Sequence, residues 1–344
     1  MTAAPTDAPV TTDDPMLATV LDTPRQWAQA VELARAVQLP DRRPRAVVVA
    51  GMGGSGVAGD VAALAGELQG QLPVVTVHGE QLPRFVGADD LVVLVSHSGS
   101  TRETLACAEQ AVERGAEMVA VTSGGQLAVV VRRGGGTVVE VPADAPPRAS
   151  MALLSVPVLA VLEVAGVVEG ALASCASVPA RLRELLTAWS PASGDGPARQ
   201  LARDLQDRIP VFLGVRGVGA LVATRARNQV AENAERPAVA AELPEADHNQ
   251  LVGWAGAGTQ GRCDLVVLRS VDESVATRRR VEATIDLARP GFAHVHEHRL
   301  PAGDTIQQVA AGLLFVDLVS VHLALLSGVD PTPIVAIEEL KRRL

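Results

Sequence analysis

Tyrosine is missing from the 344-residue chain and cysteine is scarce, with three residues, Cys107, Cys175 and Cys263. The cysteines lie far apart, are odd in number and share no Cys-x-x-Cys spacing. This pattern excludes a disulfide framework and argues against a zinc site built on thiolates. We therefore expect a cytoplasmic protein that folds without cross-links in a reducing compartment.

Basic charge is also in short supply. The formal net charge is −9 at pH 7, which argues against nucleic acid and anionic membrane surfaces as partners. Residues 1–14 are polar and acidic, and predict a disordered lead-in rather than a signal peptide. The two most apolar segments, 153–168 and 309–326, each contain an acidic residue, so they predict buried helices rather than membrane spans.

Lysine and asparagine are nearly absent. Of the 30 basic residues, Lys341 is the one lysine, and the three asparagines, Asn228, Asn233 and Asn249, fall within 22 residues. Lysine and asparagine have AT-rich codons, so a chain encoded by a GC-rich genome tends to avoid them. Such a chain retains them at positions where another residue type cannot replace them. These four residues are therefore candidates for specific roles. The alternatives are chance placement and, for Lys341, a charge at the end of a helix.

The hydrophobic residues form strand-like runs that alternate with helical stretches. The β-branched runs predict buried strands of a parallel sheet. These strands are predicted at residues 45–50, 73–77, 91–95, 118–122 and 137–141. Helical patterns over 57–68 and 102–114 connect them into a βαβαβ unit, and a further helix is predicted over 15–39. We predict an α/β fold whose first domain is a doubly wound, flavodoxin-like parallel sheet.

The chain then repeats this pattern. Residues 264–268 repeat residues 90–94 as Asp-Leu-Val-Val-Leu, and 209–220 reproduce the strand, glycine-rich turn and small-residue helix of 46–59. Such duplication predicts a second domain of the same type. The predicted segments are a lead-in at 1–14, a first domain at 15–150, a helical connector at 151–207, a second domain at 208–300 and C-terminal helices at 301–344.

Two glycine- and hydroxyl-rich turns follow strands of the first domain: residues 51–56, Gly-Met-Gly-Gly-Ser-Gly, and residues 96–101, Ser-His-Ser-Gly-Ser-Thr. Each lies where a strand ends and a helix begins, so hydroxyls and free helix N–H groups converge on a place that suits a phosphate. A plain helix-capping turn is the alternative, and Glu80 leaves a dinucleotide site open. The second domain has Arg-Ser-Val-Asp-Glu-Ser at 269–274 instead, whose carboxylates would repel a phosphate.

Together with Pro147-Arg148, Glu232-Asn233-Ala234, His248-Asn249 and Lys341, these turns follow a known order. In the order and spacing of these motifs, the chain resembles the bifunctional phosphoglucose/phosphomannose isomerases of archaea and bacteria, over about residues 20–344. The resemblance implies two sugar isomerase (SIS) domains in a homodimer that interconverts glucose 6-phosphate or mannose 6-phosphate with fructose 6-phosphate, without a metal or cofactor. It implies phosphate binding by Gly54, Ser55, Ser96, Ser98 and Thr101. It implies a sugar site lined by Arg148, Glu232, His248 and Lys341, with His248 reaching in from the other subunit.

These residue types also suit aldose–ketose chemistry on chemical grounds. Moving a carbonyl between C1 and C2 needs a base that carries a proton from one carbon to the other through a cis-enediolate, and Glu232 suits that role. Arg148 would stabilise the enediolate, because a guanidinium keeps its charge. His248 would protonate the ring oxygen, and Lys341 would assist ring opening or hold a hydroxyl. The alternatives are a solvated charge for Glu232, a loop cap for Arg148 and a helix-end hydrogen bond for His248.

Residues 294–298, His-Val-His-Glu-His, have a spacing that resembles a metal site. In a strand, His294, His296 and His298 share one face, and His-x-His occurs at zinc sites. No carboxylate or thiolate nearby in the sequence obviously completes a tetrahedral set. We therefore interpret the segment as a structural strand and expect no metal.

Two residues depart from the Ser-Tyr-Ser-Gly-Asn-Thr turn of the family, namely His97 and Ser100. His97 beside a phosphate would add a titratable positive charge, which puts substrate preference and affinity in question. The sequence leaves open glucose, mannose or another sugar phosphate as the substrate. A non-catalytic sugar-phosphate sensor is the alternative to an enzyme.

Overall fold

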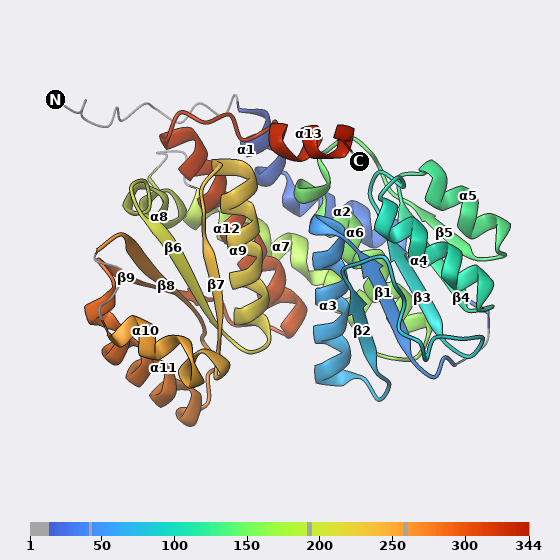
Figure 1. Cartoon of the computed structure of the whole chain (residues 1–344), viewed down its shortest axis with the longest axis horizontal. Helices are drawn as coiled ribbons and strands as arrows, with labels where there is room; N and C mark the ends of the chain where they lie inside the picture. The colour runs from blue at the N-terminus through green and yellow to red at the C-terminus, as the bar shows by residue number, and fades with distance from the viewer. Residues whose placement is uncertain (1–13, 41–42, 191–194, 257–260, 344) are drawn as a thin grey trace. The chain divides into compact units, whose positions relative to one another are not determined.

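Parallel sheets flanked by helices make up both halves of the chain in the computed structural model (Figure 1). The structure describes residues 14–40, 43–190, 195–256 and 261–343. They fall into two units. The N-terminal unit comprises residues 22–181 with 304–307, and the C-terminal unit comprises residues 182–303 and 308–343 with 14–21. The five segments predicted from the sequence stay a prediction, and the lead-in over 1–14 lies, apart from Asp14, outside the described residues.

The N-terminal unit holds a five-stranded parallel sheet in the order β2-β1-β3-β4-β5. Its strands are β1 (Val47–Gly51), β2 (Val74–Val77), β3 (Leu91–Val95), β4 (Glu117–Thr122) and β5 (Thr137–Glu140). Every residue of β1 and β3 is buried, as expected for continuous apolar runs in a sheet covered on both faces. All five predicted strands are confirmed, and their order is that of a flavodoxin-like doubly wound sheet.

Two groups of helices pack on this sheet. The helices are α2 (Thr23–Ala34), α3 (Gly53–Gln69) and α6 (Met151–Val164), which pack together, and α4 (Arg102–Glu113) and α5 (Gly125–Arg133), which pack on each other. Beneath α4 and α5, alternate β3 residues Val92 and Leu94 join Cys107, Ala111 and Leu127 in one core. This packing fixes the carboxyl end of β3, where the turn 96–101 begins.

The C-terminal unit repeats the arrangement with a four-stranded parallel sheet in the order β7-β6-β8-β9. Its strands are β6 (Ile209–Val215), β7 (Val239–Leu243), β8 (Cys263–Ser270) and β9 (Val295–Leu300). Val211 pairs with Leu265 as Val47 pairs with Leu91 in the first sheet. The predicted duplication is therefore confirmed in strand order and in register.

The helices of the C-terminal unit are α1 (Pro15–Leu21), α8 (Pro197–Asp204), α9 (Val218–Ala234), α10 (Gln250–Ala255), α11 (Val275–Ala288) and α13 (Val335–Arg343). α7 (Ala171–Trp189) and α12 (Thr305–Leu326) contribute residues to both units. One core packs Leu213 and Val267 of the sheet against Trp254, Val281 and Ile285 of α10 and α11.

The helix predicted over 15–39 is wrong in its extent. Two helices, α1 and α2, replace it, with Asp22 between them and α2 ending at Ala34. Pro24 explains the break, because proline lacks an N–H and is tolerated in the first turn of a helix but not in its interior. Three short elements, α5, β7 and α10, are absent from the sequence-based prediction.

Both strongly apolar segments are helices. Every residue from Met151 to Leu162 in α6 is buried. In the described chain, α12 alone is long and apolar enough to cross a membrane, yet 89% of its most apolar window is buried inside the protein. The prediction of buried helices is therefore confirmed. The three cysteines are free, and burial raises the pKa of Cys107 to about 11 and that of Cys175 to about 12.

Candidate functional site

The turn 96–101 folds around its own hydroxyls at the carboxyl end of β3. Ser96 Oγ donates to Thr101 Oγ1 at 2.9 Å, and the Ser100 amide donates to Ser98 Oγ at 3.3 Å. Gly99 has φ +64, and a Cβ added there would lie 1.9 Å from the carbonyl oxygen of Gly124. Glycine is required at this position, because other residues rarely adopt this conformation and none would fit the space.

The glycine-rich turn after β1 lies beside it. Gly51 pairs with Val95 in the parallel ladder, so both turns emerge at the same edge of the sheet. The His97 amide donates to Ser55 Oγ at 3.3 Å. At Gly54, a Cβ would lie 3.0 Å from the Pro147 carbonyl oxygen and 3.2 Å from the Arg148 Cα. The structure therefore brings together the predicted phosphate residues and the backbone of Arg148, whose side chain is buried.

Two helix N-termini are left uncapped at this edge. Among the described residues, no side chain forms a capping hydrogen bond to the start of α3 or of α4. Thr101 occupies the N-cap position of α4, but its hydroxyl accepts from Ser96. The hydroxyls are thus not explained by helix capping. Uncapped amides at the positive end of a helix dipole are suited to an anion.

An open pocket of about 580 Å³ borders the second turn, lined by His97, Ser98, Ser123 and residues 143–147. His97 Nε2 lies 3.1 Å from the Pro142 carbonyl oxygen. Burial lowers the pKa of His97, against the opposing effects of that carbonyl and of Asp144. Burial thus disfavours the charged form of the imidazole, and a positive charge at His97 beside a bound phosphate stays a prediction. The Asp144 carboxylate repels a second anion, so this pocket suits the hydroxyls of a sugar.

In the C-terminal unit, Arg269 of the corresponding loop, residues 269–274, forms ion pairs with carboxylates of the same chain. Arg269 is buried and forms ion pairs with Glu273 at 2.6 Å and with Glu297 at 2.9 Å. These carboxylates raise the pKa of Arg269. The two loops thus differ in composition, because the first presents hydroxyls and amides and the second an internal salt bridge, whereas phosphate binding by the first copy alone stays a prediction.

The other predicted site residues belong to the C-terminal unit. Glu232 is half-buried near the end of α9, His248 is exposed at the end of a 3-10 turn (Glu245–His248), and Lys341 is exposed on α13. These three residues therefore belong to a different unit from the two turns. Their membership of one shared site stays a prediction.

The clustered asparagines have local structural roles. Asn233 Nδ2 donates to Ser320 Oγ at 2.9 Å in the buried interior, and Asn249 Oδ1 accepts from the Gln250 amide at the start of α10. Asn228 Oδ1 accepts from its neighbour Arg227. The three rare asparagines therefore take part in local hydrogen bonds.

Sequence reasoning missed His78, which directly follows β2. Its Nδ1 lies 3.1 Å from the Gly51 carbonyl oxygen and its Nε2 lies 2.9 Å from Asp60 Oδ1. The hydrogen bond to Asp60 raises the pKa of His78. The pair thus places a titratable imidazole, held by a carboxylate, beside the first turn. The available signal was its position, because β2 ends beside β1 at the same edge of the sheet.

Comparisons with known proteins agree along nearly the whole chain. A model described as "SIS domain" matches residues 42–132, and one described as "Bacterial phospho-glucose isomerase C-terminal SIS domain" matches residues 194–344. A bifunctional phosphoglucose/phosphomannose isomerase of Aquifex aeolicus is 31% identical over 309 residues, covering 87% of this chain and 90% of the relative. The protein of the same description from Caldicellulosiruptor bescii is 27% identical over 334 residues, covering 96% and 98%.

A solved structure supports the fold. The C-terminal domain of glucosamine-fructose-6-phosphate aminotransferase from Francisella tularensis superposes with a TM-score of 0.73 at 15% identity, covering 96% of this chain and 99% of that one. At this level of identity, the likeness concerns the arrangement of strands and helices alone.

Proposed function

Because this chain belongs to the bifunctional phosphoglucose/phosphomannose isomerase family of SIS-type sugar-phosphate isomerases, we propose that it interconverts glucose 6-phosphate, mannose 6-phosphate or both with fructose 6-phosphate, in the cytoplasm. The observation that carries the proposal is the pair of turns at the carboxyl edge of the first sheet. There, Ser55, Ser96 and Thr101 lie beside two uncapped helix N-termini. This arrangement suits the phosphate that both aldoses and the ketose share.

In the proposed reaction, Glu232 removes the proton from C2 of the open-chain aldose and delivers it to C1, while the hydroxyl proton of O2 passes to O1. The reaction passes through a cis-enediolate intermediate, and the Arg148 guanidinium stabilises its negative charge. His248 protonates the ring oxygen during ring opening, and Lys341 assists that step or holds a hydroxyl. Glucose and mannose give the same enediolate, because they differ at C2 alone, so one base serves both substrates.

We further propose a homodimer in which the partner subunit's His248 completes each site. His248 is exposed in the single chain, which leaves its imidazole accessible to a second copy. A symmetric dimer would supply two such histidines, one to each site.

Glu232→Gln tests the assignment of the base. A glutamine keeps the size of the side chain and cannot accept the proton, so we expect turnover of both aldoses to fall by about 10²–10⁴-fold. A coupled assay for fructose 6-phosphate, run separately with each aldose, measures the loss. Glu235→Gln is the matched control, because Glu235 is an exposed carboxylate three residues further on; it should retain full activity.

Three results would contradict the proposal. Full activity in Glu232→Gln would remove this residue as the base. Binding of both aldose phosphates without turnover in the unmodified protein would indicate a sugar-phosphate sensor. Turnover of a different sugar phosphate alone would indicate an isomerase of another substrate.

A further inference from the structure

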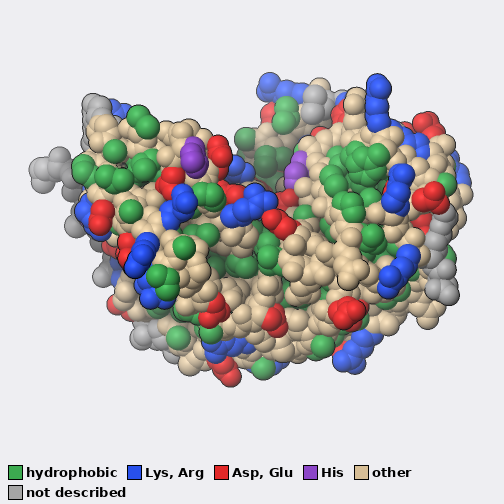
Figure 2. Space-filling model, turned by 90° about the horizontal axis from the view of Figure 1, so that it is seen from below, with side chains coloured by type: hydrophobic (Ala, Val, Ile, Leu, Met, Phe, Trp, Pro, Cys, Tyr) green, Lys and Arg blue, Asp and Glu red, His purple; other side chains and the backbone are tan. Residues whose placement is uncertain are grey.

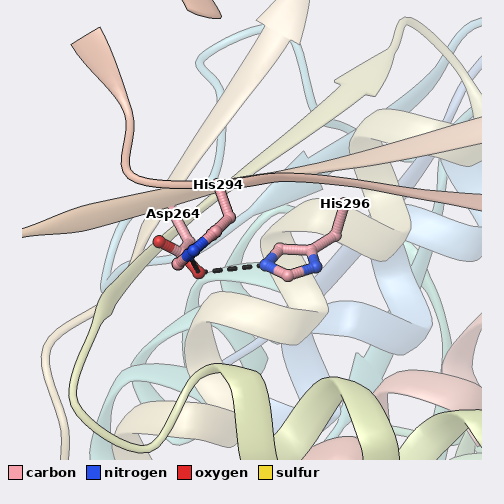
Figure 3. A group of neighbouring side chains, drawn as sticks. All are labelled: Asp264, His294 and His296. Carbon is pink, nitrogen blue, oxygen red and sulfur yellow. Dashed lines mark hydrogen bonds and ion pairs between the residues drawn. The ribbon is translucent and has the colours of Figure 1, made fainter. Parts of the chain in front are cut away.

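Three potential metal ligands meet at the amino edge of the second sheet. Asp264 is the second residue of β8, His296 lies in β9, and His294 directly precedes β9. The two strands are parallel neighbours, with Leu265 paired to Val295. Figure 3 shows both imidazoles turned toward the same carboxylate. Sequence reasoning found the histidines and missed the aspartate, because the carboxylate comes from a neighbouring strand.

The distances suit a small cation. Asp264 Oδ2 lies 2.9 Å from His296 Nε2 and 3.3 Å from His294 Nδ1, and the three ligand atoms lie within 4.8 Å of one another. In a tetrahedral zinc site, ligand atoms about 2.0–2.1 Å from the metal lie about 3.3 Å apart. His294 is exposed, so small rotations of its side chain would close the remaining gap.

The first copy of the fold offers an internal comparison. There, Asp90 is equivalent to Asp264, and Arg45 binds both its oxygens, at 3.2 and 2.9 Å. By the strand registers, Ala116 and Met118 occupy the places of the two histidines. In that copy the buried aspartate therefore forms a salt bridge with an exposed arginine.

In the second copy, Ile209 takes the register position of Arg45, and Arg208, its neighbour in the chain, is the arginine beside Asp264. Arg208 donates to the Gly261 carbonyl oxygen, and its Nε lies 3.8 Å from Asp264 Oδ1. Asp264 is fully buried, and Oδ1 has no hydrogen-bond partner among the described residues. Asp264 is thus less fully compensated than Asp90, because its Oδ1 has an ion pair at 3.8 Å in place of a hydrogen-bonded arginine, and a bound cation would add to that compensation.

A second carboxylate supports the orientation of His296. Asp204 Oδ2, at the end of α8, lies 3.7 Å from His296 Nδ1, on the side of the ring opposite Asp264. Metal-binding histidines commonly present their second nitrogen to a carboxylate, which fixes the tautomer and the ring orientation. Asp204 thus occupies the position of an outer carboxylate.

We propose that Asp264, His294 and His296 bind a divalent transition-metal ion of the zinc type, with water at the fourth position. The ion clamps β8 to β9 at the amino edge of the sheet, away from the carboxyl edge where Arg269 lies. It is a structural or regulatory site rather than a part of the isomerase reaction. This inference departs from the expectation of no metal, because the expected set lacked the carboxylate of Asp264.

The test uses the full chain without an affinity tag, stripped by a chelator and titrated with Zn²⁺ by calorimetry and with Co²⁺ by visible absorption. We expect one ion per chain and a zinc-dependent rise in melting temperature. His294→Ala and His296→Ala should each weaken binding by at least about tenfold. His248→Gln, which removes another exposed histidine, should leave zinc binding unchanged.

Arg208→Gln gives a result of opposite sign. It removes a positive charge 3.8 Å from Asp264 and keeps every ligand, so zinc should bind more tightly. The absence of one-to-one binding, or binding that both histidine variants retain, would overturn the proposal. A cluster of hydrogen bonds alone would then explain the three residues. If a histidine variant folds poorly, Arg208→Gln and the melting shift of the unmodified chain still decide the outcome.

Discussion

His298 shows how one side chain couples stability to pH. Its ring stacks on Phe315 with centroids 3.4 Å apart, and its Nε2 is buried without a hydrogen-bond partner among the described residues. Burial lowers the pKa of His298 to about 4. In the unfolded chain the imidazole takes up a proton below about pH 6.5. The unfolded state therefore binds more protons between these values, and stability falls as the pH falls from 6.5 to 4.

His298→Leu should remove this pH dependence. From pH 7 to pH 4, we expect the unmodified protein to lose about 3 kcal/mol more of unfolding free energy than the variant. Urea unfolding followed by tryptophan fluorescence measures the difference, since Trp189 lies 5.7 Å from the histidine ring. The control His248→Gln should follow the unmodified protein. Parallel losses in His298→Leu would show that other groups cause the acid sensitivity.

At the scale of elements, the turn 96–101 depends on Gly99. Gly99→Ala requires φ +64 for a residue with a side chain and places Cβ 1.9 Å from a backbone oxygen. We expect a loss of about 1–3 kcal/mol in unfolding free energy and at least about tenfold weaker binding of glucose 6-phosphate, measured by urea unfolding and calorimetry. Gly79→Ala is the control, because a Cβ there meets nothing within 4 Å. Equal effects of both substitutions would remove the turn from the binding site.

Elements were predictable from the sequence where burial governs the pattern. The strand Leu91–Val95 was predicted with its observed limits, because a fully buried parallel strand is apolar throughout. The half-exposed strand Val239–Leu243 was missed, since its burial varies along its length and leaves no clear pattern. The phosphate turns were predictable because they are local, whereas Asp264 beside His296 depends on which strands become neighbours.

At the scale of the whole molecule, the composition is acidic and charges of both signs occur on the face that Figure 2 draws. The face drawn in Figure 2 carries basic and acidic side chains interspersed with hydrophobic ones. The formal charge of −9 leaves anion binding to local sites, such as the two turns of the N-terminal unit. The duplication of the fold was predictable from the repeated Asp-Leu-Val-Val-Leu, because equal sequences form equivalent strands in the two sheets.

A complementation experiment tests the proposed dimer. Glu232→Gln and His248→Ala chains should each be inactive as homodimers. If the histidine acts across the interface, a mixed dimer pairs one intact Glu232 with one intact His248. Random mixing should then restore about a quarter of the unmodified activity, because half of the dimers are mixed and each has one working site. Light scattering verifies the dimer, and no recovery after verified subunit exchange would contradict the shared site.

The Arg269 salt bridges distinguish the loop of the second copy from the loop of the first in what neutralises its positive charge. Each copy of the fold presents a loop at the carboxyl edge of its third strand in the sheet order. In the first copy, the uncapped helix N-termini can bind an anion from solution. In the second copy, the buried guanidinium of Arg269 forms ion pairs with Glu273 and Glu297 of the same chain. In the second loop, the carboxylates of Glu273 and Glu297 thus neutralise the charge that an anion from solution would otherwise neutralise. Neutralising both carboxylates would leave the buried guanidinium with one distant counter-charge, Glu282 at 4.0 Å, which favours the uptake of an anion from solvent.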